Sequence, residues 1–223
     1  MTRILVLDTE TTGLTKDAGV VEIAWVELNQ HLDVIDTVYS LIDPQMPISP
    51  GASGVHGITN RDVADAPTLD EFFQIVKGNP FDDLDHVIVV AHNVPFDMKF
   101  VSRYIPNLAG TVCTLKCARR VYPDESEYKL QTLRFALGLE VREADAHSAN
   151  GDVEVCLALL KRMMQDTGLD VDGLIELSSM PMAITKMPFG KHKGVKLADL
   201  PADYVYWLLN KAEINDDLRA ALT

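Results

Sequence analysis

Residues 3–14 read Arg-Ile-Leu-Val-Leu-Asp-Thr-Glu-Thr-Thr-Gly-Leu, an apolar run that ends in two acids. Ile4 to Leu7 have the composition of a buried strand, and Gly13 begins a turn. Asp8 and Glu10 stand two residues apart at the strand end, so both side chains point to one face. Two carboxylates so close repel each other unless a cation lies between them, which makes the pair a candidate metal site. A charged strand end facing water is the simpler explanation of the pair taken alone.

The stretches that follow this strand predict an α/β fold with a mixed sheet. Residues 20–28 and 34–42 have the length and apolar content of strands, and the short joint between them favours an antiparallel hairpin. Residues 87–91 form another continuous apolar strand. Residues 43–60 are rich in Pro, Gly and Ser and predict a loop. Helical spacing and end signals, with Thr68 as a cap, predict helices at 68–76, 95–104, 114–121, 130–137, 147–164 and 169–177.

The chain changes character after Gly168, where the predicted helix at 169–177 closes the main domain. Residues 178–188 have the composition of a linker, and a unit of about forty residues follows, too small to be very stable alone. We therefore expect a main domain, 1–178, and a small basic and aromatic appendix, 183–223, whose role the sequence does not give. The appendix contains Tyr204, Tyr206 and Trp207, a trio more often found as a miniature core than as a platform on which bases stack.

Composition and charge limit the function classes. The chain of 223 residues has a net charge of −13, which argues against tight standing occupancy of a nucleic acid. Residues 99–134 and 183–200 nonetheless have net charges of +4 and +3 and allow weak, salt-sensitive contacts to phosphates. The apolar runs are too short to span a bilayer and no signal peptide is apparent, so a cytoplasmic location is expected. The three cysteines are expected to be reduced.

Two further acidic motifs follow predicted elements. His92-Asn-Val-Pro-Phe-Asp97 comes directly after the strand at 87–91, and ligands collect at the carboxyl ends of strands in open α/β sheets. His147-Ser-Ala-Asn-Gly-Asp152 opens a long helix. On a regular helix the side chains of His147 and Asp152 would point in different directions. Both can face one site only if His147 precedes the regular helix, and Gly151 permits such an irregular start. Each motif also has a plain explanation, because an acid in the first turn stabilises a helix.

These motifs together point to a known family. Asp-x-Glu on a first strand, Asn-x-x-x-Asp after a later strand and His-x-x-x-x-Asp on a late helix resemble, in this order, the DEDDh (DnaQ-type) 3′→5′ exonuclease family. Supporting matches are Asp8-Thr-Glu-Thr-Thr-Gly-Leu14, Val55-His-Gly-Ile-Thr59 and Leu130-Gln-Thr-Leu133. Residues 113–123 and 189–194 also resemble one bacterial DNA exonuclease of this family.

The resemblance implies an RNase H-like α/β fold, a mixed five-stranded sheet flanked by helices, and release of 5′-mononucleotides from DNA 3′ ends in DNA repair. It implies two Mg²⁺ ions, for which Mn²⁺ can substitute, since such hard cations prefer oxygen ligands. Asp8 would bridge both ions, Glu10 and Asp152 would complete one site, and Asp97 would bind directly or through water. His147 would take the proton from the attacking water, a task for a group that titrates near neutrality.

Contacts to the nucleic acid are implied as well. Thr11, Thr12 and Leu14 would line the cleft for the 3′-terminal nucleotide, although Leu14 could equally be a core residue. Asn93 and Phe96 are assigned to the same contact set. Phosphates would be contacted by basic side chains, with a solvated helix face as the alternative. The candidates are Lys116, Arg119, Arg120 and Lys129, and in the appendix Lys191, His192, Lys193 and Lys196.

Other functions share parts of this pattern. An RNA 3′-end trimming exonuclease or a polymerase proofreading subunit would carry the same motifs. An inactive nucleic-acid-binding module is a different class, and the intact Asp8, Glu10, Asp97, His147 and Asp152 count against it. The expected partners are DNA with a free 3′ end and a repair or polymerase protein, with no membrane. The sequence gives neither strand preference, processivity, pathway nor oligomeric state.

Overall fold

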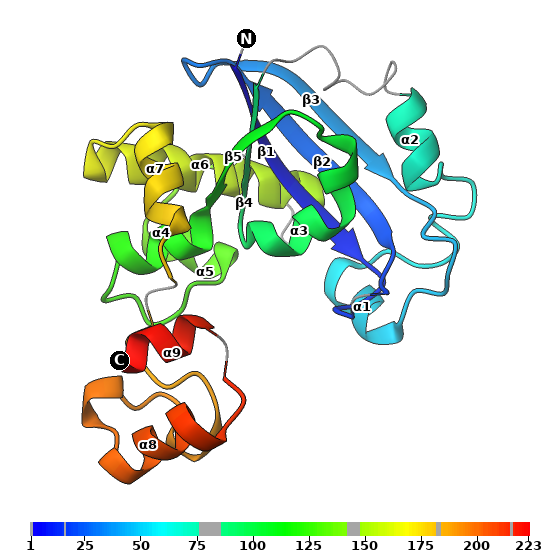
Figure 1. Ribbon diagram of the computed structural model, residues 1–223. Helices are drawn as coiled ribbons and strands as arrows, with labels where there is room; N and C mark the ends of the chain where they lie inside the picture. Colours follow the sequence, from blue (N-terminus) through cyan, green and yellow to red (C-terminus); the bar gives the residue numbers. More distant parts are fainter. Residues whose placement is uncertain (1, 16, 76–85, 142–147, 182–183, 215) are drawn as a thin grey trace.

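The computed structural model describes residues 2–15, 17–75, 86–141, 148–181, 184–214 and 216–223. The described residues form one mixed sheet of five strands in the order β3-β2-β1-β4-β5 (Figure 1). The strands are β1 (Thr2–Thr11), β2 (Val20–Leu28), β3 (Val34–Leu41), β4 (His86–Ala91) and β5 (Leu108–Cys113). β1 is central, antiparallel to β2 and parallel to β4, while β2 and β3 form the antiparallel hairpin that the sequence predicts. The predicted mixed α/β sheet is confirmed.

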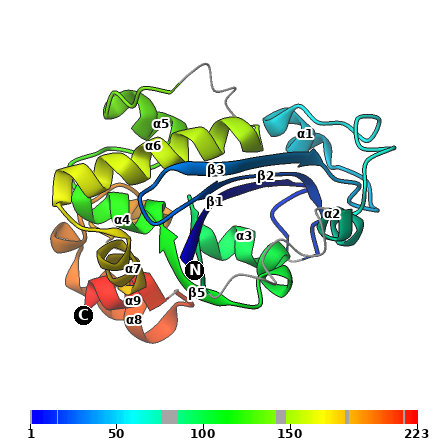
Figure 2. The same cartoon turned by 90° about the horizontal axis from the view of Figure 1, so that it is seen from above.

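Helices cover both faces of this sheet (Figure 2). The longest, α6 (Ala149–Thr167), and α5 (Leu130–Ala136) lie over one face, whereas α2 (Leu69–Ile75) and α3 (Val94–Val101) lie over the other. The remaining helices of this part are α1 (Pro50–His56), η1 (Ser102–Tyr104), α4 (Thr114–Val121) and α7 (Val171–Ser179). No helix among the described residues is both long and apolar enough to cross a membrane.

The side chains of β1 divide between the two faces by the alternation of a strand. Ile4 and Val6 join the apolar cluster that contains the inner side of α6. Leu5 and Leu7 join the opposite cluster, with the aromatic rings of α2. The same alternation carries past the apolar run, so the even-numbered acids of β1 are directed to the α6 side.

Two local predictions needed correction and one was confirmed. The Pro- and Gly-rich stretch 43–60 is not all loop, because Ser49 caps α1 and Gly57 ends it at φ 76°. Pro50 at the first position and Gly57 after the last suit the two ends of a short helix, and this helix also accommodates Gly51 and Gly54 in its interior. β5 is the strand that no predicted range contained. At the start of α2, Thr68 and Glu71 form the expected pair of capping hydrogen bonds. The Thr68 amide donates to the Glu71 carboxylate at 2.8 Å, and the Glu71 amide donates to the Thr68 hydroxyl at 3.3 Å.

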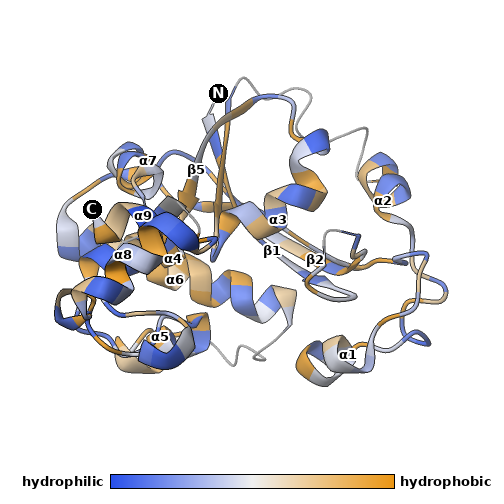
Figure 3. Ribbon diagram, turned by 60° about the horizontal axis from the view of Figure 1, so that its bottom comes forward, coloured by the Kyte–Doolittle hydropathy of each residue, from blue (hydrophilic) through white to orange (hydrophobic). Residues whose placement is uncertain are grey.

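Residues 184–223, called the C-terminal segment below, have an apolar cluster of their own. They contain η2 (Gly190–His192), η3 (Leu197–Asp199), α8 (Ala202–Lys211) and α9 (Asp216–Leu222). The buried residues of this cluster are aliphatic or sulfur-containing, namely Met187, Leu200, Leu208 and Leu218. Figure 3 shows α8 with hydrophobic and hydrophilic residues side by side, as expected of a helix with one face on a small core. The domain boundary at 178–183 stays a prediction.

The three aromatic residues of α8 do not form that core. Tyr206 is 64% exposed and Trp207 is 49% exposed, while Tyr204 packs at the edge of the aliphatic cluster. The interpretation of the trio as a miniature core is therefore wrong for Tyr206 and Trp207. Aliphatic side chains already fill the small interior, which leaves the larger rings at the surface.

Candidate active site

Three carboxylates from two distant parts of the chain meet at the end of β1. Asp8, Glu10 and Asp152 offer ligand oxygens that all lie within 4.8 Å of one another. Asp8 and Glu10 point to the face that α6 covers, and Asp152 stands in the first turn of that helix. The structure therefore brings together the first and third predicted motifs.

Asp152 is positioned by the cap of α6 and by a side chain from α5. The Ser148 side chain accepts a hydrogen bond from the Gly151 amide at 3.1 Å, which fixes the first turn. Gln131 donates from Nε2 to the Asp152 carboxylate at 2.5 Å. The sequence analysis matched residues 130–133 to the family and gave Gln131 no role. His147, the predicted proton acceptor, lies outside the described residues.

Asp97 reaches the site from the opposite face of β1. It is 3% exposed and stands in the first turn of α3. Its carboxylate accepts two hydrogen bonds from Thr9, one from the amide at 3.1 Å and one from the hydroxyl at 2.8 Å. Because Thr9 is an odd-numbered residue of β1, Asp97 is held on the other side of the strand from Asp152. Thr9 is thus a second positioning residue that the sequence analysis missed.

Burial and mutual repulsion raise the pKa values of this group. The pKa of Asp8 is raised well above its usual range, first by desolvation and then by the charges of Asp97 and Asp152. Desolvation, followed by Asp152 and Glu22, raises the pKa of Glu10 to about 8. Desolvation raises the pKa of Asp97 to about 7, against the two Thr9 hydrogen bonds, which lower it. Carboxylates in this state are stabilised by a cation.

These pKa shifts predict that the metal-free protein loses stability as pH rises. A carboxylate whose folded pKa exceeds its unfolded value contributes stability that is present below about pH 4.3 and is lost as pH rises through the folded pKa. With the pKa of Glu10 at about 8, the melting temperature in chelator is expected to fall between about pH 5 and pH 8. Thermal unfolding at several pH values measures this, and Glu10→Gln should flatten the curve. An unchanged slope in Glu10→Gln would contradict the assignment.

A fifth acid, Glu22, ties α6 to the sheet. It is 3% exposed on β2, directly opposite Glu10 in the antiparallel pair. Its carboxylate accepts a hydrogen bond from the Ala149 amide, the first residue of α6, at 2.5 Å. It also accepts one from the Tyr39 hydroxyl at 2.8 Å. A carboxylate at a helix N-terminus is favoured by the orientation of the peptide dipoles. The sequence signal was a charged residue, one of only two in the apolar strand β2.

Glu22→Ala is expected to destabilise the fold by about 1.5–3 kcal/mol, the usual contribution of a hydrogen bond to a charged group. The Ala149 amide would be left buried without its partner, whereas the Tyr39 hydroxyl can turn to water. Glu22→Gln keeps an acceptor oxygen and should recover most of the loss. Chemical denaturation measures the free energy of unfolding. Glu27→Ala on the same strand is the control: it breaks an Arg3 ion pair at 3.2 Å and should cost at most about 1 kcal/mol.

The predicted nucleotide contacts fall into two kinds. Leu14 is 86% exposed, so its interpretation as a core residue is wrong. Thr11 and Thr12 are buried, and both hydroxyls are bonded within the same region. The Thr11 hydroxyl donates to the Gly13 carbonyl at 2.8 Å, and the Thr12 hydroxyl accepts from the Gly19 amide at 3.1 Å. The two threonines therefore shape the loop from which Leu14 projects, and their contact with a nucleotide stays a prediction.

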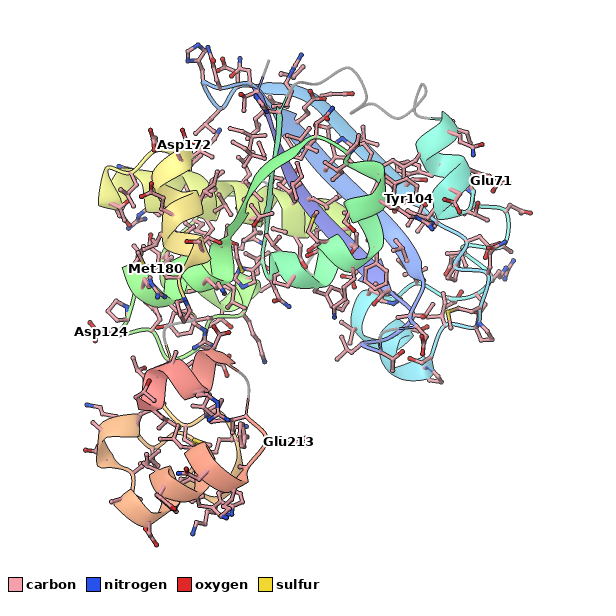
Figure 4. All side chains as sticks on the ribbon, in the orientation of Figure 1. Glu71, Tyr104, Asp124, Asp172, Met180 and Glu213 are labelled. Carbon is pink, nitrogen blue, oxygen red and sulfur yellow. The ribbon has the colours of Figure 1, made fainter. Side chains whose placement is uncertain are left out.

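The predicted basic and second-motif contacts are also placed. Lys116 donates to the Met180 carbonyl at 3.2 Å and Arg120 to the Pro181 carbonyl at 2.6 Å, so both hold the chain after α7. Figure 4 labels Met180, which follows the end of α7. Arg119 instead lies over the Tyr128 ring, 4.6 Å from its centroid. Asn93 is exposed at the start of α3 with φ 86°, and Phe96 is half-buried, edge-on to Phe100.

Comparison with known proteins identifies the class. Residues 5–160 match a protein-family model described as Exonuclease. The chain belongs to this exonuclease family. The exonuclease is 31% identical over 225 residues to Exodeoxyribonuclease 10 of Escherichia coli (strain K12), covering 97% of this chain and 96% of the relative. It is 29% identical over 235 residues to DNA polymerase III subunit epsilon of Haemophilus influenzae, covering 99% of this chain and 88% of that protein.

A solved structure agrees with these relatives. Exonuclease X in complex with 5′ overhanging duplex DNA matches the exonuclease with a TM-score of 0.64 at 31% identity, covering 80% of this chain and 100% of that chain. The predicted RNase H-like fold and the DEDDh 3′→5′ exonuclease class are confirmed. Residues 175–215 match a second model, described as a putative quorum-sensing-regulated virulence factor. That match spans a short stretch and assigns no function to the C-terminal segment.

Proposed function

We propose that the exonuclease is a Mg²⁺-dependent exodeoxyribonuclease that removes 5′-mononucleotides from DNA 3′ ends in repair, in the cytoplasm. The observation that carries this proposal is the convergence of Asp8, Glu10 and Asp152 at the end of β1. Two relatives that the chain matches over nearly their whole length support DNA as the substrate. One is named an exodeoxyribonuclease, and the other was solved with duplex DNA.

The donor set fits hard divalent cations. All the candidate ligands are carboxylate oxygens, which Mg²⁺ and Mn²⁺ prefer, and the pKa values of Asp8 and Glu10 are raised by burial and by the neighbouring negative charges. Asp8, Glu10 and Asp152 would hold the metal, with Asp97 close enough for its charge to act on Asp8. When bound, such ions activate a water molecule and neutralise the oxygen that departs.

The protein's own residues would orient the reaction around these carboxylates. Gln131 and Glu22 fix the first turn of α6 and with it Asp152, while Thr9 fixes Asp97. His147 would accept the proton of the attacking water. Water attacks the terminal phosphorus, the bond from phosphorus to the 3′ oxygen of the preceding nucleotide breaks, and the shortened strand keeps a 3′ hydroxyl. Leu14, exposed in the loop that follows β1, would contact the face of the terminal base.

A cleavage assay tests the proposal. DNA and RNA single strands of one sequence, labelled at the 5′ end, are incubated with Mg²⁺, with Mn²⁺ and with chelator. A metal-dependent ladder on DNA that shortens from the 3′ end, and that is absent in Asp152→Ala, is the expected result. A preference for RNA would replace the substrate and keep the mechanism. Folded protein that binds Mn²⁺ and cleaves neither strand would overturn the proposal.

A proofreading role is the second candidate function, because the epsilon subunit of H. influenzae matches 99% of this chain. In that case the exonuclease would bind a DNA polymerase stably. Co-purification of the tagged exonuclease with a polymerase from its own cells is the distinguishing measurement. If no polymerase is recovered and the isolated chain cleaves DNA without one, the result favours a repair exonuclease over a proofreading subunit.

A further inference from the structure

A group of aromatic and basic side chains on the C-terminal segment, here called the stacked cluster, consists of the exposed Lys191 and Trp207 and the half-buried His192 and Tyr204. The rings of Tyr204 and Trp207 are stacked, with centroids 5.7 Å apart and an interplanar angle of 20°. The His192 ring lies 4.5 Å from Tyr204, and the Lys191 ammonium lies 5.1 Å from the same ring. Gly190, at φ 73°, brings this backbone close, since an added Cβ would lie 3.2 Å from the Tyr204 hydroxyl.

The arrangement of the cluster is not explained by the needs of the fold. The buried core beneath it is made by Met187, Leu200, Leu208 and Leu218, and Trp207 is left 49% exposed. Trp207 contributes to no core and stacks on Tyr204, and Lys191 lies over the Tyr204 ring, so the pair presents an exposed π-face next to a positive charge. Single-stranded nucleic acids bind such surfaces, with bases stacked on the rings and phosphates near the cations.

A groove has lining residues that are close in sequence both to the stacked cluster and to Gln131, the partner of Asp152. It has a volume of about 640 Å³ and runs between the sheet-bearing part of the chain and the C-terminal segment. His92, Arg119 and Lys129 lie along one side, and Lys186 and Lys193 along the other. Lys129 stands two residues before Gln131, whose amide is bonded to Asp152. Lys193 directly follows His192 of the stacked cluster.

The groove is basic on balance. Its lining includes Arg119, Lys129, Lys186 and Lys193, opposed by Glu125 and Glu127. A surplus of two positive charges in a chain of net charge −13 suits a weak and salt-sensitive contact with a phosphate backbone rather than tight binding. Double-stranded DNA would present stacked bases that the rings of the cluster cannot reach.

We propose that the groove and the stacked cluster hold the single-stranded stretch of a DNA substrate several nucleotides before its 3′ end. The strand leaves the carboxylates past Lys129, passes along Lys186 and Lys193 and stacks a base on Trp207. The proposal rests on the proposed exodeoxyribonuclease function for its substrate. It assigns the C-terminal segment a role in substrate binding that is separate from the chemistry.

A binding measurement tests this without catalysis. Fluorescence anisotropy follows a labelled dT₂₀ strand with full-length protein in chelator, so that nothing is cleaved. Trp207→Ala is expected to weaken binding about tenfold, the loss of one stacked base, and Trp207→Phe to retain most of the affinity. Tyr206→Ala, which removes an exposed ring of the same helix outside the cluster, is the matched control. Equal affinities of wild type, Trp207→Ala and Tyr206→Ala would overturn the proposal.

The salt dependence tests the basic part. Each lysine that contacts a phosphate of a single strand contributes about 0.7 to the slope of log affinity against log salt. Lys191→Ala and Lys193→Ala are each expected to lower the slope by about that amount, and Lys211→Ala, at the far end of α8, to leave it unchanged. If Lys191→Ala and Lys193→Ala weaken binding to a blunt duplex as much as they weaken binding to dT₂₀, the surface does not select single strands. That result would also overturn the proposal.

Substrate length separates this inference from the proposed function. The ratio of kcat/KM for dT₂₀ to kcat/KM for dT₃ is measured with Mg²⁺, since dT₃ is too short to reach the cluster. Trp207→Ala is expected to lower the ratio about tenfold, through KM. Cleavage of both substrates with an unchanged ratio would refute the strand-holding role and leave the exodeoxyribonuclease intact. Absence of cleavage by wild type would refute the exodeoxyribonuclease, while the binding experiment would still decide the surface.

Discussion

Asp8→Asn is expected to abolish cleavage and, in the absence of metal, to raise the melting temperature. Asp8 lies among Asp97, Asp152 and Glu10, and their charges together with burial raise its pKa. The substitution removes one of the repelling charges and a ligand of the candidate metal site. We expect kcat to fall about 10³-fold or more, since a metal site contributes several kcal/mol to stabilising the transition state.

Asp8→Asn is expected to lower activity and to raise stability, a combination that general damage to the fold would not produce. At pH 8 in chelator, a gain of about 1 kcal/mol would raise the melting temperature by about 2–4 °C. Added Mg²⁺ should stabilise the wild type and leave Asp8→Asn unchanged. Asp17→Asn, which removes an exposed acid in the loop after β1, is the control and should alter neither activity nor stability. A variant that loses both activity and stability would show that Asp8 supports the fold rather than a metal.

His147→Ala is expected to lower kcat by about 10²- to 10⁴-fold while the affinity for Mn²⁺ stays near that of the wild type. The residue stands immediately before Ser148, which caps the helix that carries Asp152. A histidine there can accept a proton from a water that the carboxylates position. Calorimetric titration with Mn²⁺ and single-turnover cleavage measure the two quantities separately.

The contrast between binding and turnover decides the role of His147. His31→Ala, in the exposed turn between β2 and β3, is the matched control and should leave both quantities unchanged. Near-normal turnover in His147→Ala would overturn the assignment as proton acceptor. Loss of Mn²⁺ affinity together with turnover would make His147 a metal ligand or a support of the α6 start instead.

Much of the site could be predicted from the sequence because its signals are local. The alternation of a strand places Asp8 and Glu10 on one face, and a motif of six residues places Asp152 at a helix start. The apolar run at 87–91 locates β4, and a proline two residues before Asp97 locates α3. In each case a short stretch contains both the element and the residue it positions.

The features that were missed depend on contacts between distant residues. β5 has two exposed residues at its start and pairs only through β4, so its sequence lacks a strand pattern of its own. Glu22 looks like an isolated acid until α6 places the Ala149 amide against it. Gln131 and Thr9 likewise acquire their roles from Asp152 and Asp97. Tyr206 and Trp207 were wrongly assigned to a small core, because the sequence alone does not show that aliphatic side chains from other parts of the segment fill it.

The carboxylates at the end of β1 are complete only when residues 8 and 152 are both in place. During synthesis, the nascent chain carries Asp8 and Glu10 on the first strand long before the ribosome adds α6. The N-terminal acids therefore have no third partner until two thirds of the polypeptide has been translated. A product of premature termination before that point would lack Asp152. On the proposed metal site, nuclease activity would therefore require that α6 be synthesised and folded onto the sheet.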